Sequence, residues 1–208
     1  MTESETQEAK EVVATSKPSR SSRLYVQSGP LLAWTIIYSI LGAVIFALAS
    51  LIPMPFVMAW LFRFGIVPAT AVIAVAGAIR GPVAGFLTGY LGTLIYDMIS
   101  AGVVVTMTVP AAAWGILGLI VGLTRYDFTK GRSLAKLSVM SVVAYVVALV
   151  ILLLIGLRVE IYPTLAAMVF FLIPMLTAGI PSVFLLSPIY ARAWYVFTAK
   201  ARPSQLVS

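Results

Sequence analysis

Long apolar stretches alternate with short polar segments along most of the chain. Several of these stretches approach the roughly 20 residues that a helix needs to cross a bilayer. Their apolar residues are continuous rather than alternating with polar ones, which argues against a β-barrel. We therefore predict an all-α polytopic membrane helix bundle of about six transmembrane helices, at residues 31–51, 66–79, 82–99, 108–123, 134–157 and 163–190.

The second stretch is too short to cross roughly 30 Å of hydrocarbon at about 1.5 Å per residue. Either the helix begins earlier, within the segment FVMAWLFRFG, or neighbouring helices shield it from lipid. The pattern leaves both possibilities open.

Polar segments at the two ends divide the chain into three parts. Residues 1–29 are rich in Glu, Ser, Thr and Lys, and they have too little apolar surface to offset the entropy lost on ordering. We predict a disordered cytoplasmic tail at 1–29, a transmembrane domain at 30–192 and a cytoplasmic C-terminal tail at 193–208.

Composition supports the membrane prediction and narrows the chemistry. Sixty-one per cent of the residues are hydrophobic and 10% are charged, whereas a soluble domain is nearer half apolar and a quarter charged. The chain has no cysteine and no histidine, which excludes disulfides, thiolate nucleophiles, imidazole bases and Cys/His metal sites. We predict a multi-pass protein of the cell membrane.

The distribution of basic residues predicts the orientation. If the N-terminus is inside, the cytoplasmic segments hold all of the 14 Lys and Arg residues except Arg63 and Arg158. Short cytoplasmic loops of membrane proteins carry such an excess of positive charge. The pattern therefore predicts an N-in, C-in topology, and it accounts for the net charge of +7 without a nucleic-acid partner.

Small residues recur four positions apart in two of the stretches. Gly85 and Gly89 form one pair, within AIRGPVAGFLTGYLGTLIYDM at 78–98, and Ala43 and Ala47 form another. Such pairs allow the backbones of membrane helices to approach closely. The glycines indicate a tight bundle, while the alanines are able to contact either another helix of the chain or a partner subunit.

Four residues are candidates for binding a small molecule. Asp97 is the only acidic residue inside a predicted span, and an intramembrane charge is a functional hypothesis by default, although it also suits a carboxylate hydrated at the headgroups. Arg63 and Trp60 are able to hold a planar anionic ligand by charge and stacking, or to form an aromatic belt with a snorkelling arginine. Trp114 lies deep in the fourth stretch, where it either faces a cavity or packs.

Enzymatic chemistry finds little support in these residues. Aspartyl proteolysis inside a membrane needs two carboxylates, and a Ser-His pair needs a histidine. The lysines for a Ser–Lys pair lie at the cytoplasmic edge or in the tails, and no GK[ST] phosphate loop occurs. We predict no enzyme, no catalytic residues, no metal and no resident cofactor.

Several motifs together resemble a known family. The outer segments IPMPF and RFG, the run IRGPVAGFLTGYLGTLIYDMIS and the Trp-containing fourth stretch are similar to the substrate-binding S component of energy-coupling factor (ECF) transporters. That family often shows a run GP..G...G..GD..SD, in which Thr93 here replaces the first acid and Asp97 matches the second. The resemblance covers residues 31–190.

The resemblance implies a substrate-capture subunit for a vitamin or similar micronutrient. S components lack an ATPase and dock on a transmembrane T component with two cytoplasmic ATPases, which hydrolyse the ATP. The resemblance implies that Ala43 and Ala47 form the docking surface. It also implies that Trp60, Arg63 and Trp114 lie near the ligand, and we include Asp97 in this predicted site.

Two other classes of function stay open from the sequence. A secondary transporter or small channel working alone would use Asp97 as its ion-coupling group, and a non-transporting scaffold would bind no small molecule. The sequence names no substrate: riboflavin, thiamin, biotin, a cobalamin or queuosine precursor and a metal ion remain open. Nickel and cobalt are disfavoured because both suit imidazole ligands.

Overall fold

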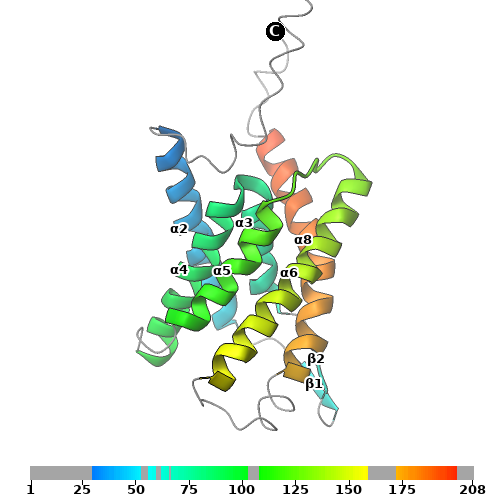
Figure 1. The fold of residues 1–208 in the computed structure, drawn as a ribbon. Helices are drawn as coiled ribbons and strands as arrows, with labels where there is room; N and C mark the ends of the chain where they lie inside the picture. Colours follow the sequence, from blue (N-terminus) through cyan, green and yellow to red (C-terminus); the bar gives the residue numbers. More distant parts are fainter. Residues whose placement is uncertain are drawn as a thin grey trace, which may run out of the picture.

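Six α-helices and a β-hairpin make up the described part of the chain (Figure 1). The computed structural model describes residues 30–52, 56–59, 62–65, 67–102, 108–158 and 172–200. The helices are α2 (Pro30–Leu51), α3 (Pro68–Arg80), α4 (Pro82–Ala101), α5 (Thr108–Gly122), α6 (Gly131–Arg158) and α8 (Ile173–Lys200); the antiparallel strands are β1 (Phe56–Ala59) and β2 (Phe62–Gly65).

The helices form a membrane bundle, as the apolar pattern predicts. Within the described ranges, four helices are long and apolar enough to cross a bilayer: Ala33–Leu51, Pro82–Ser100, Gly131–Arg158 and Ile173–Thr198. The other two, α3 and α5, have 13 and 15 residues. At about 1.5 Å per residue they are shorter than a roughly 30 Å hydrocarbon core, so the number of spans and their orientation stay predictions.

The fold decides one question that the sequence left open and corrects one prediction. The segment FVMAWLFRFG contributes strands β1 and β2, which excludes an earlier start of the second helix within it; that helix begins at Pro68. The last helix starts at Ile173 and continues to Lys200, ten residues beyond the predicted end of the span. Tertiary contact accounts for part of this extension, because the Trp194 ring meets the Tyr38 ring of α2 edge-on at 6.0 Å.

Three helices meet at glycine backbones. A Cβ atom built on Gly77 of α3 or on Gly85 of α4 would lie 2.3 Å from the carbonyl oxygen of Gly118 in α5. One turn further along α4, a Cβ atom on Gly89 would lie 2.4 Å from the Trp114 carbonyl oxygen. Real Cβ atoms do not approach so closely, so only glycine fits, and the predicted tight packing at Gly85 and Gly89 is confirmed.

Helix α2 packs on α4 through small residues as well. A Cβ atom on Gly42 would lie 3.0 Å from the Thr88 side chain, and one on Gly92 would lie 2.6 Å from the Phe46 ring. The Thr88 hydroxyl also donates a long hydrogen bond, 3.4 Å, to the Ser39 carbonyl oxygen. Because Gly42 and Gly92 have no side chain, the Thr88 and Phe46 side chains fit against them and α2 lies directly against α4.

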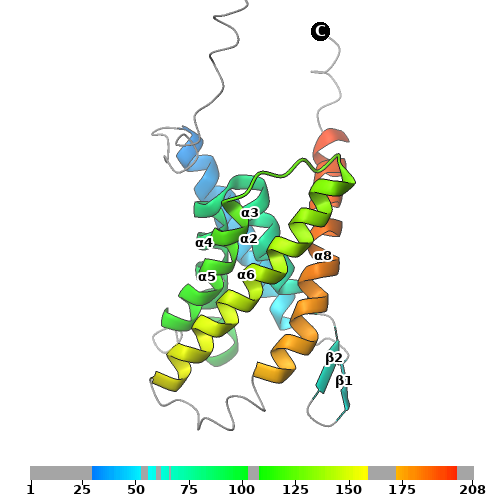
Figure 2. The same ribbon diagram turned by 45° about the vertical axis from the view of Figure 1, so that its right-hand side comes forward.

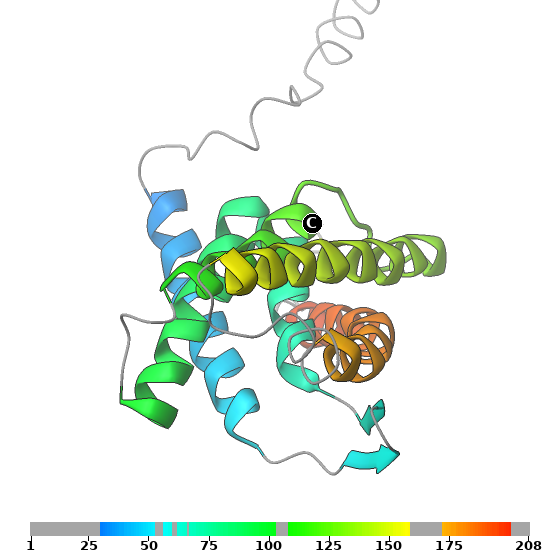
Figure 3. The same cartoon turned by 60° about the horizontal axis from the view of Figure 1, so that its bottom comes forward.

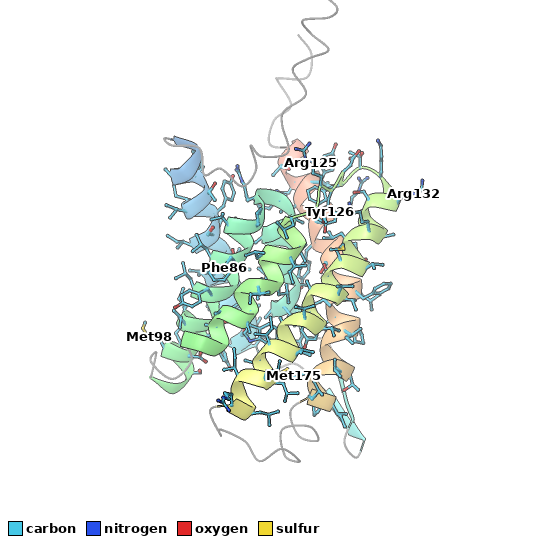
Figure 4. The ribbon with its side chains drawn as sticks, viewed as in Figure 1. Phe86, Met98, Arg125, Tyr126, Arg132 and Met175 are labelled. Carbon is cyan, nitrogen blue, oxygen red and sulfur yellow. The ribbon has the colours of Figure 1, made fainter. Side chains whose placement is uncertain are left out.

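The two ends of the bundle differ in charge and structure. The start of α2, the end of α8 and the loop between α5 and α6 lie at one end of the bundle (Figures 1 and 2). We call it the basic end because Arg125 and Arg132 lie there (Figure 4), as do Arg80 at the end of α3 and Arg192, which bonds to the loop. The hairpin lies at the opposite end, the hairpin end, at the edge of the bundle and packed on α8 (Figure 3).

Candidate functional site

The hairpin end holds Arg63, one of the predicted ligand residues. Arg63 belongs to β2, and its Cα pairs with that of Met58 in β1. The side chain of Arg63 and the whole of Trp60 lie outside the described residues. The contact of these two residues with a small molecule therefore stays a prediction.

Asp97 is a buried carboxylate in the last two turns of α4. Its residue is 8% exposed, which leaves little room for hydration. One oxygen, Oδ2, is buried and has no hydrogen-bond partner among the described residues. Its chain neighbour Met98 is exposed at the edge of the bundle (Figure 4). Because a buried charge without a partner is costly, Asp97 is suited to accept a hydrogen bond from a bound donor.

Trp114 packs into the apolar core. Its ring centroid lies 5.8 Å from that of Tyr145 in α6; Tyr145 belongs to the main core cluster, and the partly buried Trp114 packs against that cluster. The Tyr145 hydroxyl donates a 2.9 Å hydrogen bond to the Met175 carbonyl oxygen in α8, and Figure 4 labels Met175 beside these two helices. Trp114 thus helps to join α5, α6 and α8.

Asp97 and Trp114 lie at different depths in the bundle. The Trp114 backbone contacts Gly89, and Asp97 follows Gly89 by eight residues of α4. Eight residues of helix span about 12 Å along the axis. The structure therefore does not bring the two residues together at one level of the bundle.

A lateral groove at the basic end was not foreseen from the sequence. It encloses about 550 Å³ between α2, α3 and α8. The Arg80 guanidinium carbon lies 4.0 Å from the centroid of the Tyr38 ring, and both residues line the groove together with Trp194. An isolated arginine at an interhelical turn was the only sequence signal, and its stacking on Tyr38 depends on the tertiary fold.

The loop between α5 and α6 is structured at the same end, where Figure 4 labels Arg125, Tyr126 and Arg132. The hydroxyl and backbone N–H of Thr129 both donate to Asp127 and hold the pKa of that exposed carboxyl below its ordinary value. Burial raises the pKa of the Tyr126 hydroxyl. Arg192 of α8 donates a 2.9 Å hydrogen bond to the Phe128 carbonyl oxygen. These contacts attach the loop to the bundle.

The described side chains that could bind a metal ion do not form a metal site. Within the ranges that the structure describes, no three His, Cys, Asp or Glu side chains gather in one place.

Comparison with known protein families assigns the chain to a family. A family model described as ECF-type riboflavin transporter, S component, matches residues 33–193, a range that runs from α2 well into α8. The chain belongs to this family. No curated protein and no solved structure matched the chain. The resemblance in the sequence motifs is thus confirmed, and this S component is a membrane protein of a transporter.

The predicted docking pair of the S component lies inside the subunit. Ala43 and Ala47 are 0% and 1% exposed, and a Cβ atom on Gly92 of α4 would lie 3.2 Å from the Ala43 carbonyl oxygen. The small face of α2 is thus occupied by the subunit's own α4. The exposed face of α2 carries large apolar side chains instead: Trp34, Ile37, Leu41, Val44 and Leu48.

This burial changes what docking at Ala43 and Ala47 would require. A partner would reach the two alanines only if α2 moved away from α4, whereas the exposed face is accessible without such a change. Docking at the alanine pair therefore stays a prediction, and its test is given in the Discussion.

Proposed function

We propose that this S component captures riboflavin for uptake into the cell and docks on a transmembrane T component that carries two cytoplasmic ATPases. The observation that carries the proposal is the match to the riboflavin S-component family over residues 33–193. The absence of a GK[ST] phosphate loop from the sequence agrees with ATP hydrolysis by the partner subunits.

The chemistry of riboflavin suits the residues at the hairpin end. The molecule has a flat fused-ring system, an imide edge and a polyhydroxyl chain, so it needs apolar walls and a few well-placed polar groups. Asp97 supplies a buried acceptor for an imide N–H or a hydroxyl. We propose that Trp60 and Arg63 of the hairpin segment cover the ligand, and that Trp114 contributes from a deeper level.

Replacing Asp97 with asparagine is expected to weaken riboflavin binding roughly tenfold. The change keeps the shape of the side chain but removes its charge, and a hydrogen bond to a charged group contributes about 1.5–3 kcal/mol. Quenching of riboflavin fluorescence by the purified subunit measures the affinity. Met98→Leu, at the exposed neighbouring position, is the matched control. An unchanged affinity in Asp97→Asn would assign the carboxylate a role outside the ligand site.

Titration of the purified full-length chain with riboflavin, thiamin and biotin tests the function itself. We expect saturation at one riboflavin per chain and no saturation with the other two vitamins. We also expect that liposomes containing the chain alone do not accumulate riboflavin, because the energy for uptake comes from the ATPases.

Any result other than these contradicts a specific part of the proposal. Saturation with thiamin or biotin would mean that riboflavin is not the substrate. Accumulation without partners or ATP would support a transporter working alone, and binding of none of the vitamins would support a scaffold.

A further inference from the structure

The lateral groove opens on the side of the bundle rather than at either end. Leu41 and Ile45 of α2 and Phe197 of α8 line it, and all three are exposed apolar residues, Phe197 by 71%. Its inner wall comes from α3, including Val72 and Ala76. In a membrane protein, an exposed apolar surface between helices faces hydrocarbon, so the groove is accessible from the lipid.

The length of the groove matches one leaflet. Its lining on α2 runs from Tyr38 to Ala49, which is about 16 Å of helix. Half of a roughly 30 Å hydrocarbon core is about 15 Å. A single acyl chain that enters at the basic end is therefore long enough to fill the groove.

The charge at the basic end of the groove is positive. Among the described residues, Arg80 is the only charged one in the lining, and no carboxylate in that part of the chain lies within ion-pair distance of it. Its guanidinium is placed over the Tyr38 ring at 4.0 Å. Stacking uses the flat face of a guanidinium and leaves its N–H donors, which lie in the plane, available for a phosphate.

We propose that the groove binds one anionic phospholipid from the leaflet at the basic end. An acyl chain lies between α2, α3 and α8, and the headgroup phosphate accepts hydrogen bonds from Arg80. Basic pockets between membrane helices bind anionic headgroups in this way. This lipid site is separate from the hairpin end, which carries the residues proposed to bind riboflavin.

The charge distribution of the groove favours a lipid over a helix from a partner. Among the described lining residues only Arg80, at one end, is charged, and the rest of the lining is mostly apolar, which matches the charged head and apolar chain of an anionic lipid. An acyl chain is only one methylene wide and needs no widening of the groove. We therefore assign the groove to a lipid and treat a partner helix as an outcome of the test.

Native mass spectrometry of the full-length chain tests the assignment. The chain is purified in detergent and mixed with equal amounts of phosphatidylglycerol and phosphatidylcholine that carry identical acyl chains. We expect one phosphatidylglycerol per chain, retained about fivefold more than phosphatidylcholine. Arg80→Gln is expected to remove this preference, and Ala193→Leu, at an exposed position in the lining, is expected to lower retention of both lipids.

Matched controls come from α6, outside the groove. Arg132→Gln and Ala135→Leu change exposed residues at the same end of the bundle, and retention is expected to stay at the level of the unaltered chain. Equal retention of the two lipids by the unaltered chain would overturn the proposal, as would a phosphatidylglycerol preference that survives in Arg80→Gln.

A last arm separates the lipid from a partner helix. The same variants are co-expressed with the T component and the ATPases, and the amount of partner recovered with the S component is measured. Loss of the partner in Ala193→Leu with unchanged lipid retention would assign the groove to a partner helix and overturn the proposal. Riboflavin titration of these variants is expected to match that of the unaltered chain.

Discussion

Replacing Gly118 with alanine is expected to destabilise the folded subunit by about 3 kcal/mol, at the upper end of the usual effect of overpacking. A Cβ atom at this position would lie 2.2 Å from the carbonyl oxygen of Gly85. That neighbour is backbone and is unable to rotate away, so α4 and α5 must separate. Because Gly77 of α3 approaches Gly118 at the same point, the contact of α3 with α5 is lost as well.

Thermal unfolding of the purified chain in detergent measures this effect. For a chain of this size, about 3 kcal/mol corresponds to a fall of about 6–12 °C in the unfolding midpoint. Gly131→Ala is the matched control, since a Cβ atom there meets nothing within 4 Å, and its midpoint is expected to stay the same or rise slightly. Equal midpoints for Gly118→Ala and Gly131→Ala would mean that the three helices do not meet as described.

Replacing both Ala43 and Ala47 with leucine is expected to impair the subunit itself, before any partner is involved. Both alanines are buried and Ala43 lies against α4; added methylene groups in a packed interior destabilise by about 1–3 kcal/mol at each position. We therefore expect lower yield, a lower unfolding midpoint and weaker riboflavin binding together. A docking surface exposed on the free subunit would instead lose only the association with the T component.

The control pair for this experiment lies on the opposite face of α2. Val44→Leu and Leu48→Met change exposed apolar residues and keep an apolar side chain of similar size. We expect normal folding and riboflavin binding from this pair. If the alanine variant folds, binds riboflavin and fails only to recruit the T component, then α2 separates from α4 on docking and the alanine pair is the docking surface.

The two alternatives for α2 have different consequences for transport. A surface that is exposed in the free subunit allows docking without rearrangement of the bundle. A surface hidden against α4 makes docking depend on a change within the S component, so that ligand binding and docking are coupled by the same helix. The alanine experiment separates these cases because it reads stability, riboflavin binding and partner recruitment on one variant.

The sequence alone determined the helical membrane bundle and most of its helix boundaries. A membrane-spanning helix satisfies its backbone hydrogen bonds within its own segment, so each span is encoded locally as an apolar stretch. The predicted and observed helices agree closely from α2 to α6. The glycine run of α4 likewise indicated close packing, because its meaning depends on spacing within one helix.

Which helices and side chains contact one another was decided only by the tertiary structure. The spacing of Ala43 and Ala47 marks a small face of α2, but an apolar face meets lipid, another helix or a partner with the same residue types. Only the fold turns that face toward α4. The same limit applies to the placement of Arg80 on Tyr38 and to the different depths of Asp97 and Trp114. Helices are encoded locally in the chain, whereas their contacts depend on residues far apart in the sequence.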